Sequence, residues 1–237
     1  MVKVSGMERF LWFLPAVLLA GAVCGAQPSK YADRLEALQA QLETNPTNKA
    51  LLFQLGDLCF DEGGNDNHQA VLLAEQYFTR LLALDASDAR AQAMLGSTFT
   101  MKGRDAIWPT TRLSLVREGN EKMDTAVIMA PNDPLVRFTR AFNNFHMPRF
   151  MNREKTVKAD FAWLWQQVQP RPATLNEDMK LKIALCQGAL LKRQHQNAAA
   201  IAVWQAGIAF NSESPEAKEM REQIAETKRA EPPGKAE

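Results

Sequence analysis

The sequence has few cysteines, few histidines and no excess of either charge, and each shortage argues against a class of function. It holds 3 cysteines and 3 histidines, and Lys and Arg number 28 against 27 Asp and Glu. Nucleic-acid binders carry a basic excess because they displace counterions from phosphates, and this chain has none. The histidines His68, His146 and His195 lack a metal-site spacing, and no nucleophile, nucleotide-loop or dinucleotide motif occurs. We therefore expect no enzyme, metal, cofactor or nucleic-acid partner. Catalysis by scattered carboxylates is the enzymatic alternative left open, because a fold does not fix a function.

The first 26 residues have the composition of a secretory signal peptide. Lys3 and Arg9 give a basic start, an uncharged apolar run follows at 10–23, and small residues then end at Ala26. That run is shorter than the roughly 20 residues of a membrane-spanning helix. We therefore expect cleavage after Ala26 and export to the periplasm or another extracytoplasmic space. An uncleaved membrane anchor and a lipid on Cys24 are the alternatives.

The rest of the chain predicts helices almost throughout. Apolar residues recur at spacings of three and four, and no alternating β pattern competes with them. Turn-forming residues separate the segments, including Asn45-Pro46, Gly63-Gly64-Asn65 and Pro131–Pro134. Cys59 and Cys186 lie in apolar runs and are expected to be buried hydrophobes rather than a disulfide. The pattern predicts one all-α domain over 27–227 and a disordered tail over 228–237. The expected helices cover 31–42, 51–60, 70–84, 89–101, 113–130, 135–145, 157–168, 179–191 and 198–210.

Small and aromatic residues repeat along these helices in an order that resembles the tetratricopeptide repeat family. In each copy, small residues stand where two helices cross and a large apolar residue fills the next turn. The copies are Leu55, Gly56, Ala74, Phe78, Leu81 and Ala86; Leu95, Gly96, Phe99, Gly119, Met123, Ala126 and Pro131; a degenerate Ala141, Val157, Phe161 and Leu164; and Gly188, Leu191, Ala200, Trp204 and Gly207. The resemblance implies a right-handed α-solenoid of about four helix pairs. Residues 30–46 would then form an N-terminal capping helix.

Two of the copies are longer than the family's repeat. The intervals from Gly56 to Ala74 and from Gly96 to Gly119 exceed that from Gly188 to Ala200, which fits the repeat length. We expect the extra residues to form inserts between the helices, over 61–68 and 103–114. Because the second insert contains Ile107 and Trp108, Trp108 is expected to dock on the body of the solenoid. The longer spacing leaves a HEAT-like array as the alternative fold.

The resemblance also implies where a partner would bind. In tetratricopeptide proteins the first helix of each pair lines a concave groove that usually takes peptides. Here that face would be largely apolar, and the Lys/Asn/Arg carboxylate clamp of chaperone-binding members is absent. Either its phenylalanines anchor a partner protein in the cell envelope, or they are covered by the Trp108 insert or the terminal helix. The predicted groove residues are Phe53, Asp57, Phe60, Ser97, Phe138, Phe142, Phe145 and His146.

A basic and aromatic segment over 137–158 offers a second surface. Its arginines outnumber its one acid, Glu154, so the segment could meet a membrane surface or carry a lipid or small molecule. Alternatively, the segment is a solvated turn whose arginines pair with neighbouring acids. The partner's identity and the oligomeric state stay open. The residues expected to make this surface contact are Trp108, Arg149, Phe150 and Arg153.

Overall fold

The computed structural model describes residues 30–168 and 175–230, and these ranges are helical without any strand. The all-α prediction is confirmed. The expected signal peptide and the end of the expected tail lie outside the described residues. The ten α-helices and one short 3-10 helix are α1 (Lys30–Thr44), α2 (Lys49–Gly63), α3 (His68–Leu84), α4 (Ala89–Asp105), α5 (Pro109–Met129), α6 (Pro134–Phe145), η2 (Arg149–Met151), α7 (Glu154–Val168), α8 (Glu177–Arg193), α9 (Asn197–Ile208) and α10 (Pro215–Ala230).

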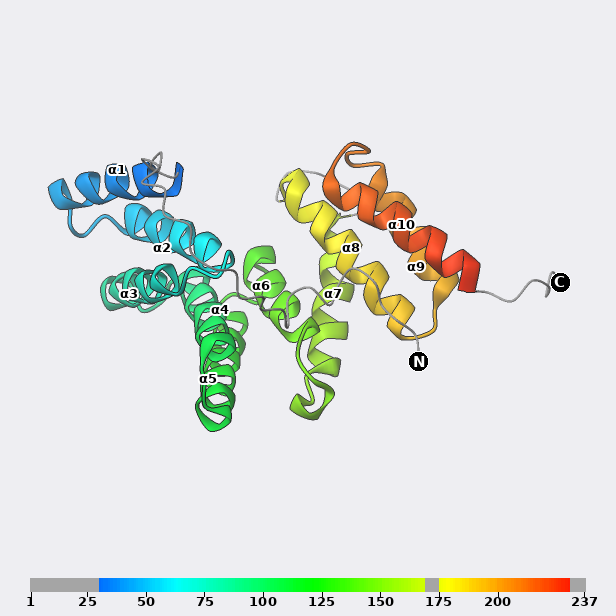
Figure 1. Cartoon of the computed structure of the whole chain (residues 1–237), viewed down its shortest axis with the longest axis horizontal. Coiled ribbons are helices and arrows are strands. Elements are labelled where there is room, and N and C mark those ends of the chain that lie inside the picture. Colours follow the sequence, from blue (N-terminus) through cyan, green and yellow to red (C-terminus); the bar gives the residue numbers. More distant parts are fainter. Residues whose placement is uncertain (1–29, 169–174, 231–237) are drawn as a thin grey trace, which may run out of the picture.

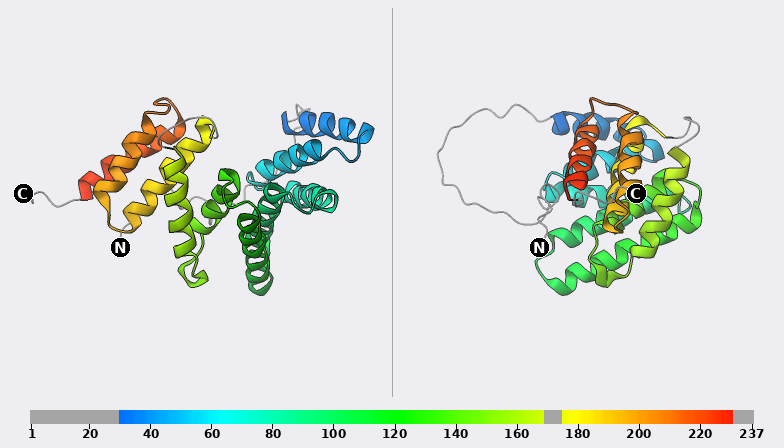
Figure 2. Two further views of the ribbon diagram at one scale, coloured as in Figure 1. Left: turned by 180° about the vertical axis from the view of Figure 1, so that it is seen from behind. Right: turned by 90° about the vertical axis from the view of Figure 1, so that its right-hand side faces the viewer.

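Consecutive helices pack as hairpins that follow one another along the chain. The pairs are α2 with α3, α4 with α5, α6 with α7, and α8 with α9, while α1 packs on α2 and α10 packs on α9 and α8. Figures 1 and 2 show α1–α3 at one end of the molecule and α8–α10 at the other. In Figure 1, α6 lies between α2 and α8. Helix α10 is not among the helices predicted from the sequence, and it carries helical structure three residues into the expected tail, to Ala230.

Polar caps fix where most of these helices begin. The side-chain oxygens of Asn48, Asn67, Asp88, Asp133 and Asn176 each accept a hydrogen bond from a backbone N–H in the first turn of the following helix. Such a cap satisfies a donor that has no partner inside the helix. The turn signals seen in the sequence therefore act as helix starts.

Small residues let the paired helices approach closely. Gly56 of α2 lies against the Phe78 ring of α3, and Gly188 of α8 lies against the Trp204 ring of α9. In the α4/α5 pair, Gly96 and Gly119 meet directly. These are positions on which the resemblance rests, and each sits at the crossing point of its hairpin.

We expect Gly96→Ala to lower the stability of the fold, although alanine favours a helix over glycine by about 1 kcal/mol. A Cβ at Gly96 would lie 2.6 Å from the Gly119 carbonyl oxygen, and a backbone atom cannot rotate away. The overlap should cost about 1–3 kcal/mol. Thermal unfolding followed by circular dichroism tests this, and an unchanged or higher midpoint would show that the helices are not in contact there.

The prediction of two inserted loops is wrong. Helix α2 extends to Gly63 and α3 begins at His68, while α4 extends to Asp105 and α5 begins at Pro109. The extra residues therefore lengthen the helices themselves, and α5 reaches 21 residues. Pro109 fits this arrangement at the first position of α5. An N–H there would have no partner inside the helix, and the φ angle that proline fixes is already helical.

The expected docking of Trp108 is also wrong. Trp108 is 71% exposed, and Ile107 beside it is more exposed still. With only residues 106–108 between α4 and α5, no chain remains to fold back onto the body. The two thiols of the described chain, Cys59 and Cys186, are buried and free, as expected.

Candidate interaction surface

One surface collects the predicted groove residues that stay accessible. It is formed by α2, α6 and α8, the first helices of their pairs, and we call it the first-helix face. In Figure 1 these helices lie on the inner side of the row, while α3 and α5 lie on the outer side. Its residues are Phe53, Asp57, Phe60 and Asp61 of α2, Phe138, Phe142 and His146 at α6, and Asp178 and Lys182 of α8.

An aromatic row runs along α6 at helical spacing. The rings of Phe138 and Phe142 stack with centroids 5.7 Å apart, and Phe142 meets His146 edge-on at 4.9 Å. Phe142 is 41% exposed. Partial desolvation by the surrounding side chains, and then the positive charge of Arg193, lower the pKa of His146, which favours the uncharged ring. The row is therefore a largely apolar strip, ended by an imidazole, that solvent reaches at Phe142 and His146.

Neither of the expected covers lies over this row. Trp108 extends into solvent, and α10 packs against α8 and α9. Within the described part of the chain, the alternative in which the phenylalanines are sealed by the insert or the terminal helix therefore does not hold for Phe142. Phe145 is buried, but by other helices: it packs against Phe161 of α7 and lies beneath the Arg193 guanidinium of α8.

The α2 edge of the face is acidic. Asp57 and Asp61 stand one helical turn apart, and neither carboxylate has an ion-pair or hydrogen-bond partner among the described residues. Partial desolvation by neighbouring side chains, and next the charge of Asp61, raise the pKa of Asp57. Partial desolvation also raises the pKa of Asp61, against the opposing effects of Lys182 and Arg34. Because Lys182 belongs to α8, the α2 and α8 edges lie within electrostatic range of each other.

Ser97 is closed to a ligand by bonds between α4 and α6. Its hydroxyl is buried and accepts a hydrogen bond from the Asn143 Nδ2 at 2.9 Å. The Asn143 Oδ1 accepts in turn from the Thr100 hydroxyl at 2.6 Å. Phe53 and Phe60 are only half-buried, but both pack against the core cluster between α2 and α3. Of the predicted groove residues, Asp57, Phe142 and His146 are the exposed ones.

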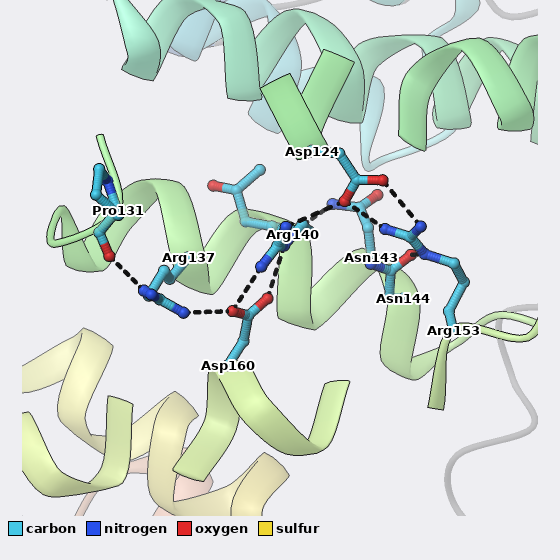
Figure 3. Close-up of polar contacts among 9 residues, drawn as sticks. Asp124, Pro131, Arg137, Arg140, Asn143, Asn144, Arg153 and Asp160 are labelled. Carbon is cyan, nitrogen blue, oxygen red and sulfur yellow. Dashed lines mark hydrogen bonds and ion pairs between the residues drawn. The ribbon is translucent and has the colours of Figure 1, made fainter. Parts of the chain in front are cut away.

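The arginines of the basic segment serve internal packing. Asp160 of α7 is 0% exposed and accepts hydrogen bonds at 2.8 Å from Arg137 and from two nitrogens of Arg140. Arg140 and Arg153 both pair with Asp124 of α5, at 3.1 and 2.6 Å. Figure 3 shows this network joining three helices and the chain after α6. The expected pairing with acids is therefore found for Arg137, Arg140 and Arg153, although these side chains are mostly buried rather than on a solvated turn.

What is left of the predicted second surface is small. Arg149 and Phe150 in η2 are exposed, and Phe150 borders a depression of about 330 Å³. That depression lies between α5 and η2 and is lined by Arg117, Asn120, Glu121, Asp124, Phe150, Met151, Asn152 and Arg153. A larger, open depression of about 780 Å³ runs along α5.

The described residues contain no group of three or more His, Cys, Asp or Glu side chains placed to hold a metal ion. None of the helices in the same ranges is long and apolar enough to cross a membrane.

Two contributors to the first-helix face were missed in the sequence. Asp61 falls within the stretch expected to be a loop, so it was not placed on α2. Continuing the helical spacing from Asp57 by one turn would have included it. Asp178 is absent from the predicted groove residues, although it pairs with Lys182 of the same helix at 2.9 Å.

No protein-family model matches this chain, and no curated protein matches it. The resemblance to tetratricopeptide proteins therefore depends on the sequence positions that carry it.

Proposed function

We propose that this chain is an exported, non-enzymatic scaffold of the tetratricopeptide type that binds a protein partner in the cell envelope through its first-helix face. In this proposal it is a right-handed α-solenoid of about four helix pairs. Export is inferred from residues 1–26. The observation that carries the binding role is the uncovered aromatic row at Phe142.

Two physical arguments support a binding role for that row. Large aromatic side chains dominate binding energy when a partner removes them from water. The row also lies on a helix held by its neighbours, because Thr139 and Asn143 contact α4 and Arg140 is bound to Asp160. A rigid, apolar helix face is suited to take an extended or helical segment of another protein.

We expect Phe142→Asp to weaken partner binding by about 30-fold or more, the effect of losing a residue worth about 2 kcal/mol. Immobilised wild-type and variant proteins would be compared for capture from an envelope extract, with captured proteins identified by mass spectrometry. Ile128→Asp is the matched control, because Ile128 is an exposed apolar residue on the outer helix α5. Equal capture by wild type and Phe142→Asp would reject this face as the binding site.

A second candidate is contact with a membrane surface through η2. The exposed Phe150 beside Arg149 favours it, since aromatic and basic side chains suit the lipid–water interface. Residues 27–237 should then float with vesicles containing anionic lipid and lose this on Phe150→Ser. Failure of the wild-type protein to float would reject this mechanism.

A further inference from the structure

We infer that the partner of the first-helix face presents lysine or arginine side chains next to apolar ones, as in a basic amphipathic segment. This inference rests on the proposed function and specifies the partner's chemistry. It follows from the combination of an exposed aromatic row on α6 with unpaired carboxylates on α2.

The aromatic row needs an apolar occupant. Phe138, Phe142 and His146 follow one another by one helical turn, and the lowered pKa of His146 favours its uncharged ring. No side chain of the row carries a charge, so an apolar side chain laid along it meets no unpaired charge, and the polar atoms of the row are confined to the His146 imidazole. This part of the face therefore favours apolar side chains, whether the residues beside them in the partner are basic or acidic.

The acidic edge decides the charge of that occupant. Asp57 and Asp61 repel each other across one turn of α2, an arrangement that destabilises a helix. A cation placed between them would interact favourably with both carboxylates and reduce their repulsion.

The cations already near the face are engaged elsewhere or stay at a distance. Lys182 pairs with Asp178 at 2.9 Å, and Arg193 donates to the Phe145 carbonyl at 2.9 Å. Arg34 of α1 influences both aspartates electrostatically but forms no ion pair with either. An acidic partner would therefore meet like charge at the α2 edge, whereas a basic partner finds two free carboxylates.

Three peptides of equal length test this: one alternating Leu and Lys, one Leu and Glu, and one Ser and Lys. Each is labelled with a fluorophore, and its binding to residues 27–237 is followed by fluorescence anisotropy at low and high salt. We expect the Leu–Lys peptide to bind at least tenfold more tightly than the other two. Its affinity should fall as salt rises, because salt screens the ion pairs.

The double variant Asp57→Asn/Asp61→Asn should weaken the Leu–Lys peptide about tenfold and remove most of its salt dependence. A matched pair on the outer helix α5, Glu118→Gln/Glu121→Gln, should change neither. The asparagine variant should fold at least as well as the wild type. The pKa values of Asp57 and Asp61 are raised in the fold, so the stability that these acids contribute is present at low pH and is lost as the pH rises. At neutral pH their charges are therefore unfavourable to folding, and the neutral amides remove them.

Each contrary result is informative. Equal or tighter binding of the Leu–Glu peptide, or no Leu–Lys binding, would overturn the basic partner while leaving capture through Phe142 to be judged separately. Equal binding of the Ser–Lys peptide would show attraction by charge alone and would also overturn it. If Phe142→Asp captures partners as well as wild type does, the proposed function itself fails, whichever peptide binds.

Discussion

Replacing Asp160 by alanine is expected to lower the free energy of unfolding by about 3–5 kcal/mol. Its carboxylate is fully buried between α6 and α7 and is the acceptor for Arg137 and two nitrogens of Arg140. Removing it leaves two mostly buried guanidinium groups with fewer counter-charges. Arg140 keeps Asp124, but Arg137 retains only the Pro131 carbonyl and the Trp163 ring.

Chemical denaturation monitored by circular dichroism measures this loss. Glu154→Gln is the control, because Glu154 lies on the same helix and its ion pair with Lys158 is exposed, at 68% and 45% of their side-chain surfaces. That variant should leave the unfolding midpoint unchanged. A triple variant that replaces Asp160, Arg137 and Arg140 by apolar residues of similar volume should recover part of the stability. Most of the loss in Asp160→Ala comes from leaving buried guanidinium groups without a counter-charge, and the triple variant has no such groups. Equal losses from Asp160→Ala and Glu154→Gln would contradict a buried network.

Local patterns predicted the helices well because the causes are local. Apolar spacing sets which face of a helix is buried, and residues such as Asn48 and Asp88 fix where a helix begins. The small residues at crossings were predictable for the same reason, because only Gly or Ala allows the contact seen between Gly96 and Gly119.

The helices formed by polar stretches could not be predicted from local patterns. Residues 61–63 and 103–105 look like loops by composition, yet they complete α2 and α4. Helix α10 was missed because its surface is strongly polar and its apolar side, including Met220, is visible only against α8 and α9. In each case packing against a neighbouring helix stabilised a segment whose own sequence gives a weak signal.

The candidate interaction surface was predictable in part. Phe138, Phe142 and His146 follow from helical spacing together with the repeat register. Which phenylalanine is buried does not, because Phe145 is covered by α7 and α8, and their position depends on the whole stack. Likewise, the basic segment's arginines could not be assigned to Asp160 or Asp124 until α5, α6 and α7 were placed side by side.

Two tryptophans provide the sharpest comparison between a residue that packs and one that does not. Trp204→Ala should lower the free energy of unfolding by about 3–5 kcal/mol, the usual loss for a buried tryptophan. Trp204 is fully buried, rests on Gly188 and donates from Nε1 to the Leu185 carbonyl at 3.1 Å. The truncation would leave a cavity between α8 and α9 and an unpaired carbonyl.

Trp108→Ala should change that free energy by less than about 0.5 kcal/mol, because surface substitutions without specific partners cost little. The Trp108 ring stands in solvent at the start of α5, and its side chain caps nothing there. Paired denaturant titrations of the two variants therefore separate helix-pair packing from an exposed tip. A large loss at Trp108 would mean that the tip is bound to the body in solution, and the first-helix face would then have to be examined for closure by that tip.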